Sequence, residues 1–158
     1  MRRLLTNLTL ASLALFALAV FPRHWLTGGE RELGLLTERV CAEGTKTCEV
    51  HSLATLADGW WPLAGTVAFG SALVVAAALV VGWLSRQRAF GHLAMLASAV
   101  ALGAGLAFVL GRPSALAATY SLNMGPVLML LATLFGLLTG RIMARGEAAI
   151  PGQASRAG

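Results

Sequence analysis

The chain has 158 residues, of which 57% are hydrophobic and 12% are charged, and its mean hydropathy is +0.74. Soluble domains average about 45–50% apolar and about 25% charged residues, so this composition excludes an ordinary water-soluble globule. It also excludes intrinsic disorder, which requires low hydrophobicity and high net charge. The sequence therefore predicts an integral membrane protein with little mass outside the bilayer.

Four stretches of the chain are apolar enough to cross a membrane as helices, which takes about 20 consecutive apolar residues. They lie at residues 4–21, 60–84, 90–111 and 124–143. We expect four transmembrane helices in an antiparallel bundle, which with their connections form one domain over residues 1–146. A flexible cytoplasmic tail is expected at 147–158.

The first stretch also has a second interpretation. Arg2 and Arg3 precede a short apolar run that contains Ala17-Leu18-Ala19, a pattern that resembles a cleavable signal peptide. Cleavage after residue 19 would leave the directions of the other three helices unchanged, because the loop 22–59 lies on the same side in both cases.

The cationic side chains divide unequally between the two sides of the membrane. With a cytoplasmic N-terminus, the inner segments hold seven arginines and one acid, and the outer segments hold five cations and six acids. Because cytoplasmic segments are enriched in Lys and Arg, we expect both termini in the cytoplasm and the loops 22–59 and 112–123 outside. This asymmetry accounts for the net charge of +5 without nucleic-acid binding.

The predicted helices contain no Asp, Glu, Lys or Arg before Arg141. Charges inside a membrane are costly and mark ion pathways or proton relays, so we expect neither a transporter nor a catalytic residue there. His92 is the one titratable group near the start of the third stretch, and no second intramembrane histidine accompanies it. The sequence therefore predicts no cofactor and no metal site.

Small residues recur at every fourth position in three of the stretches. Such stripes let the backbones of membrane helices approach closely. We expect the helices to pack through Ala64, Ala68, Ala72, Ala97, Ala101, Gly105, Ala132, Gly136 and Gly140.

Both cysteines of the chain, Cys41 and Cys48, lie in the loop 22–59. Two cysteines outside the cytoplasm most simply form one disulfide. With residues 43–46 as a four-residue loop, they face each other as a non-hydrogen-bonded pair of a β-hairpin, where side chains are closest. The predicted fold class is thus an all-α integral membrane protein with a small disulfide-pinned β-hairpin in its first outer loop.

Two chemical uses of the cysteines stay open beside the structural disulfide. A membrane thiol oxidoreductase would use a C-x-x-C pair and a second pair of cysteines, whereas this chain has one pair spaced C-x₆-C. A metal site of Cys41, Cys48, His51 and His24 matches no common zinc spacing. We favour the structural disulfide.

The order of these features resembles the claudin and peripheral myelin protein family. Trp25, then Gly34-Leu35-Leu36, then Cys41 and Cys48 follow the order of the family's first outer loop, and the run Cys48–Leu56 is similar to its approach to the second helix. Leu36 stands where the family has tryptophan. The resemblance implies four helices, cytoplasmic ends, a long first outer loop and a contact or scaffolding role.

We therefore expect a non-enzymatic contact protein that binds another membrane protein or a second copy of itself through its outer loop. The contact candidates are Trp25, Leu35, Leu36, Glu43 and Lys46. The alternatives are a small accessory subunit of a larger membrane complex and, ranked below it, a thiol redox enzyme. Eleven arginines against one lysine, with abundant alanine, are typical of GC-rich bacteria, so we expect a bacterial inner membrane.

Overall fold

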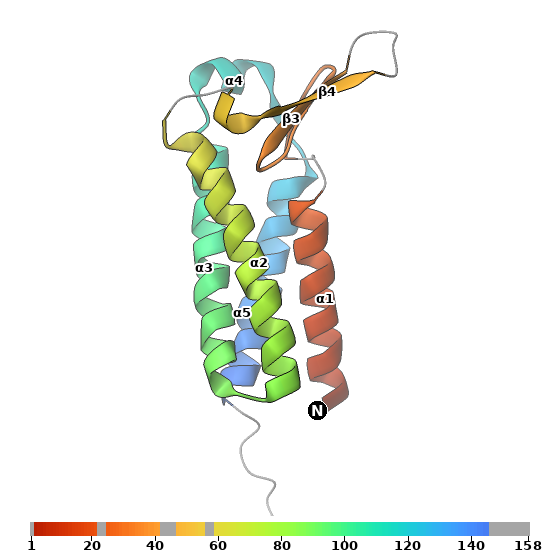
Figure 1. The fold of residues 1–158 in the computed structure, drawn as a ribbon, viewed down its shortest axis with the longest axis vertical. Coiled ribbons are helices and arrows are strands. Elements are labelled where there is room, and N and C mark those ends of the chain that lie inside the picture. The colour runs from red at the N-terminus through yellow and green to blue at the C-terminus, as the bar shows by residue number, and fades with distance from the viewer. Residues whose placement is uncertain (1, 22–24, 42–46, 56–58, 146–158) are drawn as a thin grey trace, which may run out of the picture.

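The computed structural model describes residues 2–21, 25–41, 47–55 and 59–145. Four of its helices are long and apolar enough to cross a membrane: α1 (Arg2–Val20), α2 (Trp61–Ser85), α3 (Arg88–Leu110) and α5 (Met124–Arg145). They run side by side as a bundle (Figure 1). The predicted four-helix membrane fold is confirmed, and no helix end differs from its predicted position by more than two residues.

The two ends of the bundle differ. The start of α1 and the end of α5 lie at one end, and all the strands lie at the other (Figure 1). We call the end that carries the strands the sheet end. The end with the start of α1 and the end of α5 is the far end. The predicted tail at 147–158 lies outside the described residues.

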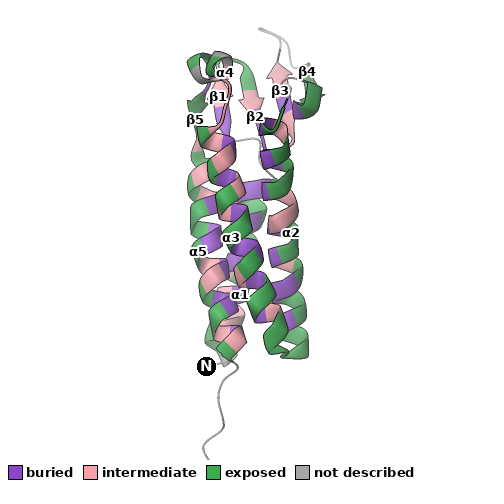
Figure 2. Ribbon diagram, turned by 90° about the vertical axis from the view of Figure 1, so that its left-hand side faces the viewer, coloured by how far each residue is buried: buried purple, intermediate pink, exposed green. Residues whose placement is uncertain are grey.

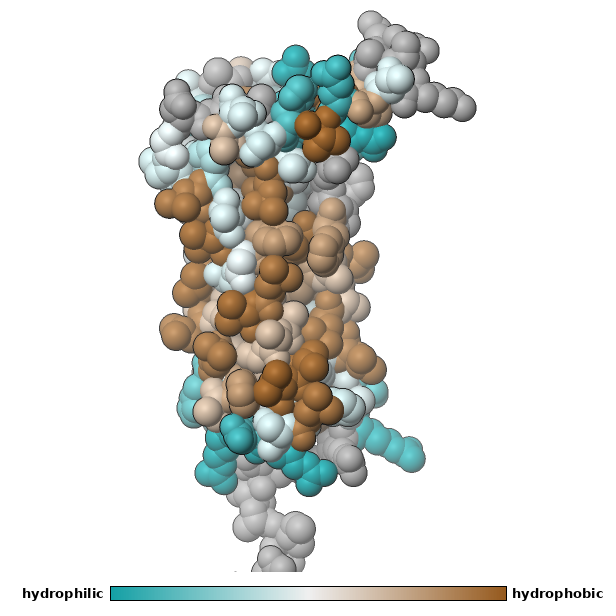
Figure 3. Space-filling model, viewed as in Figure 1, coloured by the Kyte–Doolittle hydropathy of each residue, from teal (hydrophilic) through white to brown (hydrophobic). Residues whose placement is uncertain are grey.

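An apolar band surrounds the bundle between these ends. Figure 3 shows hydrophobic side chains over the middle of the molecule and hydrophilic ones above and below. Large apolar side chains are exposed on all four long helices, for example Leu10, Leu63, Leu96 and Leu134. An apolar surface of this extent is unfavourable in water, and it matches the hydrocarbon layer that such helices span.

Small residues line the contacts inside the bundle. The α3 helix packs against both α2 and α5, and α1 packs mainly against α5. All nine small residues of the stripes lie buried, and Figure 2 colours the buried parts of the helices purple. A Cβ atom built on Gly140 would lie 2.8 Å from the carbonyl oxygen of Gly91, so a larger residue there would force α3 and α5 apart.

The sheet end carries a five-stranded antiparallel sheet in the order β4-β3-β2-β1-β5. The first loop supplies β1 (Leu26–Gly28), β2 (Arg31–Leu33), β3 (Thr37–Cys41) and β4 (Cys48–Ser52), and a 3₁₀ turn, η1 (Leu53–Thr55), follows. The second loop supplies α4 (Ser114–Thr119) and β5 (Ser121–Leu122).

The sheet is larger than the predicted hairpin. The hairpin itself is β3 and β4, and its predicted disulfide is confirmed. The strands β1, β2 and β5 are three, three and two residues long, too short for an alternating pattern to indicate them. Gly29, at a φ of 59°, opens the tight turn between β1 and β2, as a two-residue hairpin loop of type II′ requires.

Candidate interaction site on the sheet

An aromatic cluster fixes the sheet to the bundle. The Trp25 indole packs edge-on against the Phe108 ring, and the Trp61 indole stacks on the same ring, with centroid distances of 5.6 and 4.7 Å. Trp25 Nε1 donates to the carbonyl oxygen of Ala19, and Trp61 Nε1 donates to that of Phe108, both at 2.7 Å. These carbonyls belong to the last turns of α1 and α3, which lack partners within their own helices. The two indoles therefore cap two helix ends while filling the space under the sheet.

A buried polar network joins the two loops. Glu38 on β3 is 2% exposed, and its carboxylate accepts a hydrogen bond from the Tyr120 hydroxyl. Arg31 Nη1 lies 3.7 Å from the same carboxylate. Burial raises the pKa of the Tyr120 hydroxyl, and the bond to Glu38 raises it further, so Tyr120 is a neutral donor at neutral pH. Since a buried carboxylate is costly without partners, the network holds the second loop against β3.

Further contacts hold the second loop at the other side of the sheet. Strand β5 pairs with β1, with Leu122 opposite Leu26. Arg112 Nη1 donates to the carbonyl oxygen of Tyr120 at 3.3 Å. A Cβ atom on Gly28 would lie 2.4 Å from the carbonyl oxygen of Thr119, so glycine alone permits this approach. These contacts thus join the two loops into one unit.

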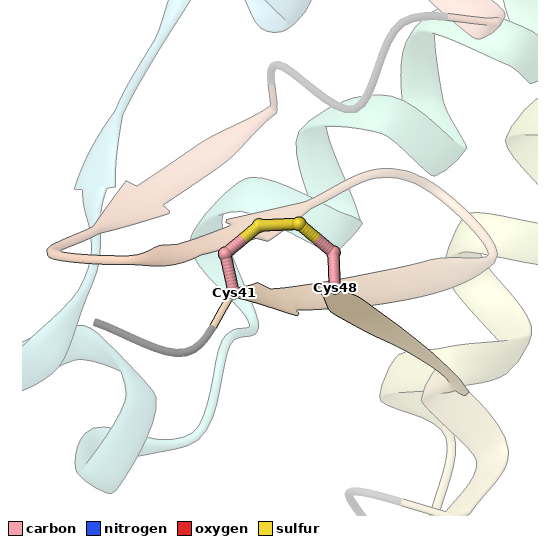
Figure 4. Close-up of a disulfide and its surroundings, with 2 residues drawn as sticks. All are labelled: Cys41 and Cys48. Atoms are coloured by element: carbon pink, nitrogen blue, oxygen red, sulfur yellow. A yellow bond between two sulfur atoms is a disulfide. The ribbon is translucent and has the colours of Figure 1, made fainter. Parts of the chain in front are cut away.

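The hairpin of β3 and β4 projects from this unit, and a disulfide ties it. Figure 4 shows Cys41 and Cys48 joined across the two strands. Their Cα atoms are 4.1 Å apart. The Cys41 amide donates to the carbonyl oxygen of Glu30, on the side of β2. Cys41 and Cys48 are therefore a non-hydrogen-bonded pair of β3 and β4, as predicted.

The outer edge of the sheet is β4. In the part of the chain that the structure describes, β4 pairs with β3 alone. Because the cysteine pair is not hydrogen-bonded and the pattern alternates, the backbone N–H and C=O groups of Cys48 and Val50 face away from β3. Residues Glu49 to Ser52 are exposed, and Val50 is 50% exposed. This strand offers free backbone hydrogen-bonding groups beside an apolar side chain.

The expected contact residues lie in different environments. Trp25 and Leu35 are 0% and 1% exposed, so their prediction as surface contacts is wrong: Trp25 caps α1, and Leu35 belongs to the core under the sheet. Leu36 is half-buried and packs against that core. Glu43 and Lys46 lie outside the described residues.

Three residues of the site were absent from the expected set, namely Glu38, Val50 and Tyr120. Tyr120 is the single tyrosine of the chain and lies in a loop without acids. These two facts are all that the sequence offers to indicate a special role for Tyr120. Glu38 stands among five other acids of the outer segments, so nothing local distinguished the buried one. Among the described residues, no group of three or more His, Cys, Asp or Glu side chains is placed so that it could hold a metal ion.

Comparison of the chain with known protein families and with curated proteins finds no match.

Proposed function

We propose that the protein is a non-enzymatic membrane contact protein whose outer sheet binds a β-strand of a partner, in the simplest case a second copy of the chain. The observation that carries this proposal is the free edge of β4, held in place by the disulfide and the buried Glu38 network. Exposed strand edges recruit further strands through main-chain hydrogen bonds. The claudin-like order of features in the first loop supports the same role.

The charges of β4 favour one register of self-pairing. Two β4 strands paired antiparallel about Val50 bring Glu49 of each copy opposite His51 of the other. A register shifted to either side by one hydrogen-bonded position would lose both Glu49–His51 pairs, and in one direction it would set Glu49 opposite Glu49, where like charges directly opposite are destabilising. Val50 would then meet Val50 as a hydrogen-bonded pair, which fits its outward N–H and C=O groups.

We also propose that the sheet faces the oxidising side of a bacterial inner membrane and that both termini are cytoplasmic. The split of cationic residues supports this orientation, and so does the disulfide, since disulfides persist in oxidising compartments. Single cysteines at Ala54 and Arg86 test it with an impermeant maleimide. Ala54→Cys should react in intact cells and Arg86→Cys only after permeabilisation, and the reverse pattern would contradict the orientation.

The contact itself is tested with two differently tagged copies expressed in one cell. Val50→Pro removes an N–H that β3 does not use, so the sheet should persist, whereas Val50→Thr keeps both the N–H and the β-branched shape. Capture of one tag should co-isolate the other for the wild type and Val50→Thr but not for Val50→Pro. Equal co-isolation of all three would contradict strand pairing at β4.

The same experiment distinguishes self-association from the alternative function, an accessory subunit. If wild-type copies do not co-isolate with each other but one other protein appears in constant stoichiometry, regardless of Val50, the chain is a small accessory subunit of a larger complex.

A further inference from the structure

An apolar groove of about 220 Å³ runs between α3 and α5. Leu106 and Val109 line the α3 side, Val127 and Leu130 line the α5 side, and the Trp25 indole reaches it from the first loop. All the residues that line the groove are apolar. Leu106 and Val127 are each 51% exposed, so the groove opens onto the surface of the bundle. The two helices that form it, α3 and α5, lie side by side (Figure 2).

The position of the groove limits what fills it. Its deepest α3 residue, Leu102, lies eight residues before the end of the helix at Leu110, which is about 12 Å at 1.5 Å per residue. The hydrocarbon core is about 30 Å thick, so the groove lies in the half of the membrane next to the sheet. It is smaller than the roughly 300–1,000 Å³ of sites for compact ligands. A narrow hydrocarbon chain suits this shape and polarity.

A cation stands beyond the end of the groove nearest the sheet. Arg112 follows Val109 by three residues, and its bond to the Tyr120 carbonyl oxygen holds the guanidinium in place. No carboxylate among the described residues lies within ion-pair distance of Arg112, and the loop 112–123 contains no acid. A guanidinium has five N–H donors in a fork that matches a phosphate, so donors remain after the bond to Tyr120.

We propose that this groove binds one acyl chain of a glycerophospholipid from the leaflet on the sheet side, with the lipid phosphate against Arg112. The apolar walls hold the chain by burying it, and the guanidinium neutralises the phosphate at the interface, where lipid headgroups lie. The bound lipid would cover the side of the groove at which Trp25 supports the sheet, so it would be a structural lipid of the sheet end.

Native mass spectrometry of the full-length protein, purified in detergent and titrated with dioleoyl phosphatidylglycerol, tests the proposal. Val127→Trp fills the groove, and Leu130→Trp is a second filling variant. Leu131→Trp is the matched control, because Leu131 is exposed on α5 but does not line the groove. Arg112→Gln removes the headgroup partner, and Arg141→Gln controls for the loss of one exposed cation at the far end.

Both filling variants should lose the bound lipid, and Arg112→Gln should weaken its binding about two- to fivefold, the effect of an exposed ion pair. The two controls should match the wild type. Dihexanoyl phosphatidylglycerol, with the same headgroup and short chains, should bind more weakly than the dioleoyl lipid. Unchanged lipid binding in Val127→Trp and Leu130→Trp would overturn the proposal. A homo-oligomer that both filling variants dissociate would also overturn it, since a second copy would then occupy the groove.

Discussion

Substitution of Tyr120 by phenylalanine tests how the two loops are joined. The change removes one hydroxyl and keeps the ring that fills the space beside Glu38. Among the described residues, the Glu38 carboxylate, 2% exposed, then retains only Arg31 at 3.7 Å, and the Arg31 side chain is 54% exposed. An ion pair to such an exposed partner is worth about 0–1 kcal/mol, too little to compensate.

The size of the effect follows from the lost bond. A hydrogen bond to a charged group contributes about 1.5–3 kcal/mol, and a buried group left without its partner loses that stabilisation. We expect Tyr120→Phe to destabilise the packing of the second loop on β3 by about 2 kcal/mol, which is roughly a 30-fold increase in the equilibrium constant for local opening. The helices should be unaffected, because the network lies outside their contacts.

Hydrogen exchange of the β2 and β3 amides in detergent measures this opening directly. Exchange there should accelerate by roughly 30-fold in Tyr120→Phe, while amides in the middle of α3 keep the wild-type rate. The double variant Glu38→Leu with Tyr120→Phe should exchange more slowly than Tyr120→Phe alone, because replacing both partners by apolar groups leaves no orphaned charge. Wild-type exchange in Tyr120→Phe, or a double variant that exchanges faster than Tyr120→Phe, would refute the reasoning.

Three further predictions concern the Tyr120 hydroxyl, the contacts between the helices and the Trp25 indole. Tyr120 is the single tyrosine, and its raised pKa places the midpoint of tyrosinate absorbance above the ordinary 10.0. The hydrogen bond from Tyr120 to Glu38 should be complete below pH 10 and lost as the pH rises through that higher pKa. A midpoint at 10 would contradict this prediction. Ala68→Leu, at a fully buried position, should lower the thermal midpoint in detergent, at a cost of about 1–3 kcal/mol, whereas the exposed Val80→Leu should not; equal midpoints would remove the support for close helix contacts. Trp25→Phe should cost about 1–3 kcal/mol through the bond to Ala19, whereas Trp60→Phe, at an exposed side chain, should be neutral; a neutral Trp25→Phe would mean that the indole does not cap α1.

Much of the transmembrane part was predictable because one physical requirement dominates it. A stretch of apolar residues long enough to cross a bilayer can only be a helix there, since its backbone groups must be satisfied internally. The disulfide was predictable for a similar reason: two cysteines seven positions apart about a short turn have one simple arrangement. These features depend on local sequence alone.

The sheet end was harder to predict because its contacts join distant parts of the chain. Strand β5 is two residues long and forms by pairing with β1. The paired residues Thr27 and Ser121 are 94 positions apart in the sequence. Glu38 is buried because Tyr120 supplies its hydrogen bond, and no pattern within Thr37–Cys41 indicates that partner. Trp25 is expected among the contact residues of the outer loop, but the carbonyl oxygen of Ala19, which has no partner within α1, gives its N–H a buried acceptor.

The most direct test of the proposed contact is oxidative cross-linking of a Val50→Cys variant in native membranes. Symmetric pairing of two β4 strands about Val50 sets the two Cα atoms about 5.5 Å apart as a hydrogen-bonded pair, within the range of about 4.4–6.8 Å that a disulfide spans. Ala54→Cys, which is exposed but four positions beyond the centre of pairing, is the control. We predict a disulfide-linked dimer for Val50→Cys and monomer for Ala54→Cys; monomer for both variants would contradict the pairing of two copies through β4.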